Sequence, residues 1–117
     1  MSEKCCIGDG SPIEGLIFHD VNPASPEQMA ALFKALGDTR RLEIMEIVAD
    51  EGDACACALL DELEISPSTL SHHTRILTQA GLLKCYRKGK WAHYLINESG
   101  VEAARELLGH LSRRNRD

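Results

Sequence analysis

The sequence predicts a mainly α-helical fold with one β-hairpin, arranged as a winged helix-turn-helix. The chain has 117 residues, which argues for a single domain because domains usually hold about 100–200 residues. Four segments with helical spacing of apolar residues follow one another between residues 26 and 80. Two runs rich in apolar and aromatic residues then flank a glycine-containing turn, and a last helical pattern follows.

The first two helices carry their own start and stop signals. Pro26 suits the first position of a helix, and Gly37 ends its apolar series. Asp38 is a natural N-cap for the second helix, which the acidic, glycine-containing residues 50–53 interrupt. We therefore expect helices over residues 26–36 and 39–49.

The next elements give the helix-turn-helix and its hairpin. A short third helix is expected over residues 55–64, and Ser66 and Pro67 begin a fourth that stops at Gly81. Two helices joined by a tight turn fit a helix-turn-helix, whose second helix enters the major groove of DNA. The last elements expected are strands at 82–86 and 91–96, a turn at 87–90 in which Gly89 supplies a positive φ, and a helix over 98–112.

Residues 1–25 differ from the rest and predict a flexible N-terminal arm that carries a cysteine pair, with residues 26–117 as the folded domain. No apolar run approaches the roughly 20 residues of a membrane span. No secretory leader opens the chain, so we expect a cytoplasmic protein without a membrane partner, whose thiols serve ligation or redox chemistry rather than a disulfide framework.

Charge is distributed unevenly along the chain. The formal net charge of −5 argues against a nucleic-acid partner when it is taken as a whole. Residues 1–64, however, carry −10, residues 65–97 carry +5 without a single acid, and residues 98–117 are balanced. The basic window is either a solvated face or a footprint for phosphates, and we favour the footprint.

The fourth predicted helix has two different faces when residues are placed at 100° intervals. Its apolar arc includes His73, which we interpret as a packed, hydrogen-bonded core residue. The opposite arc offers short hydroxyls, an amide, an imidazole and one arginine, which suit base edges and phosphates. With the neighbouring Thr69, the candidate DNA contacts of this helix are Ser68, Thr69, Ser71, His72, Arg75 and Gln79.

The predicted hairpin tip adds Arg87, Lys88 and Lys90 as candidate contacts to the DNA backbone or the adjacent minor groove. The alternative is an ordinary charged turn. We favour the DNA contact because the tip belongs to the same acid-free window as the fourth helix.

Cys55 and Cys57 form the most informative short motif. Thiolate sulfur binds soft metals and metalloids better than oxygen or imidazole does. Residues i and i+2 of a regular helix do not face each other, so both sulfurs can share an ion only if the helix start is unwound. Such an ion would deform the helix that positions the DNA-reading helix, which predicts a switch. The alternative is two small core residues.

A further ligand must come from elsewhere in the protein. Cys5 and Cys6 are the natural donors, from the same chain or from a dimer mate. Cys85 lies within a predicted strand, and we interpret it as a buried structural cysteine. A zinc site is less well supported, since no paired Cys-x2-Cys or His-x3-His spacing occurs.

These residues together resemble the ArsR/SmtB family of metal-responsive repressors over about residues 28–97. The resemblance implies a homodimeric winged-helix protein that binds a palindromic operator and releases it when an ion binds, so residues 26–117 would serve both DNA binding and dimerisation. The arsenite-responsive branch, associated with arsenical resistance, is the most similar, and there three thiolates hold As(III) or Sb(III). The matching segments are Leu32–Leu42, Cys55–Cys57, Ile65–His73, Ala80–Leu83 and Gly89–Tyr94.

Three departures from the arsenite-responsive pattern qualify this resemblance. Leu60 stands where many members have a third cysteine, which shifts weight to Cys5 or Cys6 as the third ligand. An N-terminal cysteine pair also resembles the family's Cd(II) and Pb(II) sensors, which use four thiolates. Pro67 and Ser68 replace the usual Gln-Pro, so base preference does not carry over.

The sequence therefore predicts a repressor that As(III) or Sb(III) releases from DNA. Two alternatives stay open: a Cd(II)- or Pb(II)-responsive repressor of the same fold, and a repressor that senses oxidants through its thiols. An enzyme is not expected, because the Cys-x-Cys begins a helix beside an acidic loop without a βαβ pattern around it.

Overall fold

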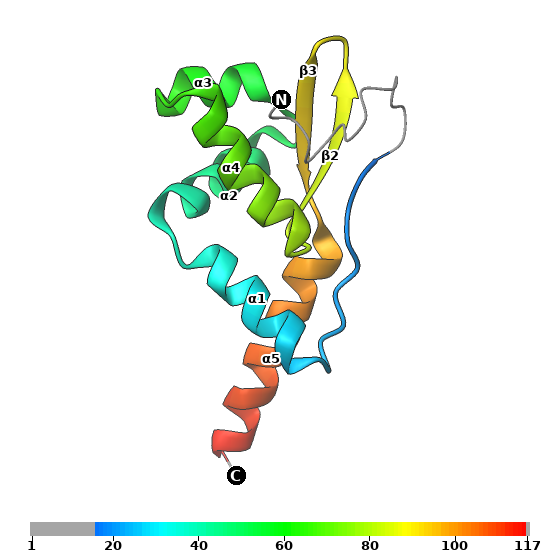
Figure 1. Ribbon diagram of the computed structural model, residues 1–117. Coiled ribbons are helices and arrows are strands. Elements are labelled where there is room, and N and C mark those ends of the chain that lie inside the picture. The colour runs from blue at the N-terminus through cyan, green and yellow to red at the C-terminus, as the bar shows by residue number, and fades with distance from the viewer. Residues whose placement is uncertain (1–15, 117) are drawn as a thin grey trace.

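The computed structural model describes residues 16–116, with side chains up to residue 113 (Figure 1). The chain folds into helices packed around a small antiparallel sheet. In chain order the elements are α1 (Pro26–Leu36), α2 (Thr39–Glu51), β1 (Ala54–Cys55), α3 (Ala56–Leu63), α4 (Pro67–Gln79), β2 (Leu83–Lys88), β3 (Trp91–Ile96) and α5 (Glu98–Arg116). The predicted mainly helical fold with a hairpin is confirmed.

Side-chain caps fix the starts of three helices. The side chain of Ser25 accepts a hydrogen bond from the backbone of Gln28 at the start of α1, and Asp38 accepts one from Arg41 at the start of α2. Ser66 does the same for α4 through the backbone N–H of Thr69, at 3.1 Å. Each cap satisfies an N–H that has no partner within the helix, so these starts are readable from sequence.

The sheet has a third strand that the sequence did not predict. β2 and β3 form the expected hairpin, and the two residues of β1 pair antiparallel with β3, giving the order β1-β3-β2. A two-residue strand has no alternation of polar and apolar residues, so its sequence carries no strand signal. The hairpin turn is tighter than expected: Lys88 pairs with Trp91, and Gly89 in the turn has φ +65°.

The core lies between the helices and the inner face of the sheet. Tyr94 of β3 is buried, and its hydroxyl lies 3.2 Å from Oγ1 of Thr74 on α4. None of the helices between residues 16 and 116 is both long and apolar enough to cross a lipid bilayer. The largest fully buried apolar side chains besides Tyr94 are Leu32, Ile44, Leu59, Leu77, Leu82, Leu83 and Val48.

The second half of the predicted N-terminal arm runs beside β2 and leads into α1 (Figure 1). Ile17 and Cys85 exchange two backbone hydrogen bonds, of 2.8 and 3.0 Å. The carbonyl oxygen of His19 accepts a hydrogen bond from Nδ2 of the buried Asn97, at 3.1 Å. Residues 1–15, with Cys5 and Cys6, lie outside the described part of the chain.

α5 begins against the body and extends away from it toward the C-terminus (Figure 1). Leu108 and Leu111 on its outer part are 55% and 52% exposed. Large apolar side chains at this exposure on one helix leave a face that a partner can cover.

Candidate functional site

The thiol pair sits where β1 passes into α3. Cys55 is the N-cap of α3 in an extended conformation, with φ −74° and ψ 142°. Its sulfur accepts a hydrogen bond from the backbone N–H of Cys57, at 3.1 Å. The helix was expected to begin at about residue 55, but Cys55 belongs to the strand and the helix begins at Ala56, so the unwound start that a shared ion requires is present.

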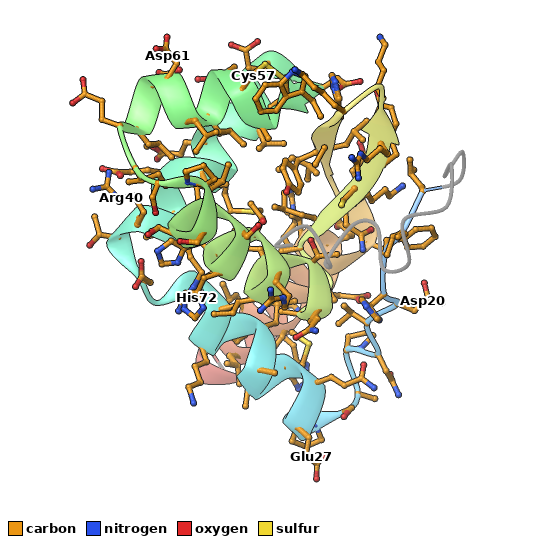
Figure 2. All side chains as sticks on the ribbon, turned by 45° about the horizontal axis from the view of Figure 1, so that its top comes forward. Asp20, Glu27, Arg40, Cys57, Asp61 and His72 are labelled. Carbon is orange, nitrogen blue, oxygen red and sulfur yellow. A yellow bond between two sulfur atoms is a disulfide. The ribbon has the colours of Figure 1, made fainter. Side chains whose placement is uncertain are left out.

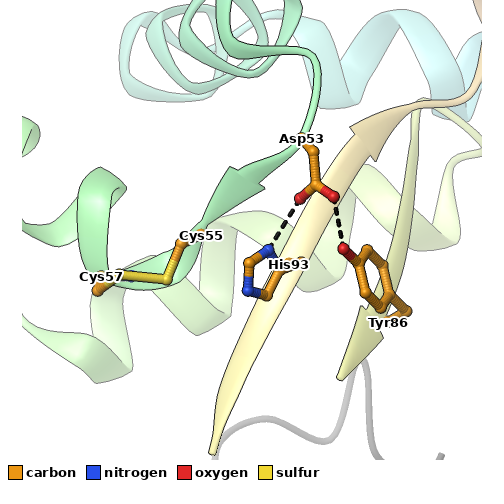
Figure 3. Close-up of polar contacts among 5 residues, drawn as sticks. All are labelled: Asp53, Cys55, Cys57, Tyr86 and His93. Carbon is orange, nitrogen blue, oxygen red and sulfur yellow. Dashed lines mark hydrogen bonds and ion pairs between the residues drawn. A yellow bond between two sulfur atoms is a disulfide. The ribbon is translucent and has the colours of Figure 1, made fainter. Parts of the chain in front are cut away.

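Cys55 and Cys57 are joined by a disulfide, with their Cα atoms 5.1 Å apart (Figure 3). The local backbone therefore brings the two sulfurs together, which a regular helical spacing would not do. Cys57 is exposed and Cys55 is half-buried. When reduced, two thiols so placed are a donor pair for a soft ion.

The structure does not complete a ligand set around this pair. Cys5 and Cys6 are outside the described residues, and Cys85 is fully buried in β2. Within residues 16–113, no three His, Cys, Asp or Glu side chains are grouped so that they could hold a metal ion.

A carboxylate cluster that sequence reasoning missed lies beside the thiol pair. Asp53, directly before β1, accepts a hydrogen bond from the hydroxyl of Tyr86 on β2, at 2.5 Å. The other oxygen of Asp53 lies 2.8 Å from Nδ1 of His93 on β3 (Figure 3). Asp53 is 33 and 40 residues from these partners. No local pattern marks such a contact, although the acid-free window did contain His93.

The hydrogen bonds in this cluster shift the protonation of its members. Burial alone would raise the pKa of Asp53, but hydrogen bonds from Tyr86 and His93 outweigh it and hold that pKa below its ordinary value. The hydrogen bond to Asp53 raises the pKa of Tyr86. Both shifts keep Asp53 ionised and Tyr86 protonated, which is the state that the hydrogen bond between them requires.

The face of α4 that was predicted to read DNA is largely open to solvent. Ser68, Thr69, His72 and Gln79 are exposed, and Arg75 is half-buried. Figure 2 shows His72 on α4, and Cys57 on the neighbouring α3. The side chains proposed to read bases therefore lie on the helix that follows α3, and the thiol pair lies at the start of α3.

The prediction that Ser71 points outward is wrong. Ser71 is only 7% exposed. The buried face of α4 is turned toward Ser71, Thr74 and Thr78 because the hairpin packs on that side. The hydroxyl of Thr74 donates a hydrogen bond to the backbone carbonyl oxygen of Ser71, at 3.3 Å. The hydroxyl of Thr78 donates one to the carbonyl oxygen of Thr74, at 2.7 Å. A threonine that bonds its own helix can be buried although it is polar.

The hairpin tip presents two exposed lysines, Lys88 and Lys90, with Nζ of Lys90 5.9 Å from the ring centre of Trp91. Arg87 is half-buried, and its Nε is buried without a hydrogen-bond partner among the residues that the structure describes. Arg87 and Ser71 line one cavity of about 160 Å³ between α3, α4 and the hairpin.

Comparison with known proteins identifies the family. The profile described as "Bacterial regulatory protein, arsR family" matches residues 38–84. An HTH-type transcriptional regulator of Methanocaldococcus jannaschii is 39% identical over 85 residues, which is 73% of this chain and 96% of the relative. The chain belongs to the ArsR family. This ArsR-family protein is therefore a DNA-binding transcriptional regulator, and the family assignment from sequence is confirmed.

Other relatives of this ArsR-family chain carry resistance functions in their names. A cadmium resistance regulatory protein CadC homolog of Staphylococcus aureus is 34% identical, over 71% of this chain and 69% of the relative. An arsenical resistance operon repressor of Bacillus subtilis is 42% identical, over 59% of this chain and 66% of the relative. The relatives include regulators named for arsenical and for cadmium resistance, so they do not single out one ion.

Solved structures of similar proteins agree with the fold. The homodimeric winged helix-turn-helix DNA-binding domain of a possible ArsR-family regulator from Mycobacterium bovis matches with a TM-score of 0.59 and 27% identity, covering 76% of this chain and 80% of that one. Reduced HlyU from Vibrio cholerae matches with a TM-score of 0.60 and 30% identity, over 73% of this chain and 88% of that one. The family consists of DNA-binding regulators rather than enzymes.

Proposed function

We propose that this ArsR-family repressor binds operator DNA and releases it when As(III) or Sb(III) binds Cys55 and Cys57 in their reduced form. The observation that carries the proposal is the placement of two sulfurs at the start of α3, the first helix of the helix-turn-helix. Each thiol that binds arsenous acid replaces one hydroxide, and water leaves. Cys5 or Cys6 supplies the third sulfur, from the N-terminal arm.

The position of the pair explains how an ion acts on DNA binding. The sulfur of Cys55 accepts the N–H of Cys57, which is one of the free donors at the start of α3. An ion bound to both sulfurs competes with the N–H of Cys57 for the sulfur of Cys55. Its bond to a third ligand then displaces residue 55. α3 joins α4 through residues 64–66, so a displaced α3 moves the helix proposed to read DNA.

The operator is proposed to be a palindrome read by a homodimer. The exposed Leu108 and Leu111 on α5 supply an apolar face for a second copy. Two copies of α4 related by a twofold axis read half-sites about one helical turn apart. The DNA contacts come from the exposed side chains of α4 and from the hairpin tip. The proposed set is Ser68, Thr69, His72, Arg75, Gln79, Arg87, Lys88 and Lys90. The operator lies in the cytoplasm, which is where we place the protein.

Cd(II) or Pb(II) is the second candidate inducer, favoured by the similarity to a cadmium resistance regulator. The number of ligands distinguishes it from arsenite. As(III) takes three sulfurs, so one of Cys5 and Cys6 is dispensable, whereas Cd(II) in a four-thiolate site needs both.

Thiol oxidation is a third candidate, supported by the Cys55–Cys57 disulfide. In that reaction the two thiols give two electrons and two protons to peroxide, which is reduced to water. The protein then responds to peroxide without any ion.

The experiment measures operator affinity by fluorescence anisotropy on fully reduced protein, titrated separately with arsenite, Cd(II), Zn(II) and peroxide. We expect arsenite to release the DNA, and Cys55→Ser and Cys57→Ser each to bind DNA normally without responding. Serine keeps an N-cap oxygen at residue 55, so α3 is retained. Cys5→Ser and Cys6→Ser, compared singly and together, count the arm ligands. An arsenite response that survives Cys55→Ser contradicts the proposal.

A further inference from the structure

Three side chains form a row across the outer face of the sheet. Cys55 pairs with His93 in the β1–β3 register, and His93 pairs with Tyr86 in the β2–β3 register. Directly paired residues of antiparallel strands point to the same face, with Cβ atoms about 4.5–5.5 Å apart. The alternate residues Ala54, Tyr94 and Cys85 point inward and are buried. The row therefore joins a thiol of the proposed site to both strands of the hairpin.

Asp53 connects the two hairpin residues of this row, His93 and Tyr86. One oxygen of its carboxylate lies 2.8 Å from Nδ1 of His93 and the other accepts the hydroxyl of Tyr86, so a single side chain bridges β3 and β2 (Figure 3). The rings of Tyr86 and His93 also lie against each other, with centres 5.2 Å apart. Asp53 is two residues before Cys55. A displacement of Cys55 therefore reaches the carboxylate through a very short piece of backbone.

The hairpin is free to respond at its far end. Among the described residues, the hairpin pairs with the two residues of β1, Ala54 and Cys55, and with Ile17 at Cys85, so residues 86–92 have backbone pairing only within the hairpin. The cavity of about 160 Å³ between α3, α4 and the hairpin leaves room on the inner side. Tyr86 is followed directly by Arg87 and Lys88, two of the proposed DNA contacts. A change in the bonds of Asp53 to Tyr86 and His93 would therefore change the positions of Arg87 and Lys88.

We propose that Asp53 is a positioning residue that couples the state of the Cys55–Cys57 pair to the hairpin, through its bonds to Tyr86 and His93. Asp53 binds neither the inducer nor DNA in this scheme. We call the thiol pair closed when both sulfurs bind one ion or form a disulfide. Closure rotates residue 55, and Asp53 transmits that rotation to both hairpin strands. The inference rests on the proposed function insofar as it assumes that the state of the thiol pair controls DNA binding.

The single tryptophan of the chain reports on the hairpin without DNA. Trp91 begins β3, is partly exposed and lines the cavity next to α3. Its emission is recorded on reduced protein before and after closing the thiol pair with arsenite and, separately, with the thiol oxidant diamide. Arsenite binding is followed independently by protection of the thiols from alkylation. Operator affinity is then measured for the same states.

Asp53→Asn is the test variant, because asparagine keeps the size of the side chain and removes its charge. Asp50→Asn is the matched control, since Asp50 is an exposed acid three residues away without a hydrogen bond or ion pair in the described part of the chain. Tyr86→Phe removes one of the two bonds and serves as a second variant. Circular dichroism establishes that all three are folded.

We expect both probes to change Trp91 emission in the wild type and in Asp50→Asn. In Asp53→Asn we expect the thiols still to close, but the change in Trp91 emission to be lost. The ratio of operator affinities before and after closure is expected to be about tenfold smaller than in the wild type. Tyr86→Phe shows a smaller loss. A Trp91 change in Asp53→Asn as large as that in Asp50→Asn, or none in the wild type with either probe, overturns the inference. If diamide changes Trp91 emission in the wild type and arsenite does not, arsenite is excluded as the inducer. The role of Asp53 is then tested by comparing the diamide response of Asp53→Asn with that of Asp50→Asn.

Discussion

Arg41 on α2 donates a hydrogen bond from Nη1 to Nδ1 of His73 on α4, across 3.2 Å. Arginine offers no acceptor, so Nδ1 of His73 must accept and the ring proton is on Nε2. The same guanidinium donates from Nε to the carbonyl oxygen of Ala35, at 2.6 Å. This contact ties α1 and α2 to the helix proposed to read DNA, and it requires a neutral histidine.

The first prediction concerns pH. Burial lowers the pKa of His73, the Asp38 carboxylate partly opposes this, and the Arg41 cation lowers it further. The unfolded chain therefore binds a proton at this position before the folded one does as the pH falls. The contribution of His73 to stability is fully present above the ordinary histidine pKa of about 6.5 and is lost as the pH falls through the lower folded value.

Urea unfolding at pH 7.5 and at pH 5.5 measures this effect. We expect the wild type to lose stability at the lower pH, and His73→Gln to lose less. His72→Gln, which changes the exposed neighbour, is expected to behave as the wild type does. An equal loss in His73→Gln and the wild type would contradict the assignment.

The second prediction concerns the packing of α5 against the loop after α4. A Cβ on Gly100 would overlap the carbonyl oxygen of Gly81, which is backbone and cannot move aside. Gly100→Ala should therefore destabilise the fold by about 3 kcal/mol. Gly109→Ala is the matched control, because its Cβ would meet only the flexible end of Arg113, at 3.4 Å. Alanine there should stabilise α5 by about 0.5–1 kcal/mol. Thermal unfolding of both variants measures the difference.

The third prediction concerns the role of Arg75 in binding phosphates. Arg75→Ala should weaken operator binding and reduce the slope of log K against log salt by about 0.9 for each phosphate that the arginine neutralises. Arg105→Ala removes the same charge from an exposed position on α5, where the ion pair of Arg105 among the described residues is with the similarly exposed Glu102, at 3.6 Å. Anisotropy titrations at several salt concentrations compare the two variants. The same slope in Arg75→Ala as in Arg105→Ala would exclude a phosphate role for Arg75.

The fourth prediction concerns self-association. Leu111→Glu places a charge on the exposed apolar face of α5 and should convert a dimer to a monomer. Operator binding should weaken with it, because a monomer contacts a single half-site. Leu42→Glu is the control, since Leu42 is a similarly exposed leucine on α2, at 47%. Sedimentation velocity would contradict the proposed interface if Leu111→Glu kept the wild-type mass or if the wild type were monomeric.

Local signals in the sequence were sufficient for the start of α4 and for the place of the hairpin turn, but not for the two-residue strand β1. Ser66 and Pro67 mark the start of α4 because a capping oxygen and a preset φ act within one turn. Gly89 marks the hairpin turn because few residues tolerate its positive φ. The spacing of Cys55 and Cys57 allowed a shared ion only at an irregular helix start, and the structure has such a start. These properties depend on residues at most a few positions apart.

Sequence alone thus determined the order of the helices and the hairpin, the family and the thiol pair, but not the strand β1. The tertiary structure decided which side chains meet around that pair. It placed Asp53 between Tyr86 and His93, which are 33 and 40 residues away. It also buried Ser71, because the hairpin covers that side of α4. Helical periodicity describes one helix by itself, whereas burial and long-range hydrogen bonds depend on what packs against it.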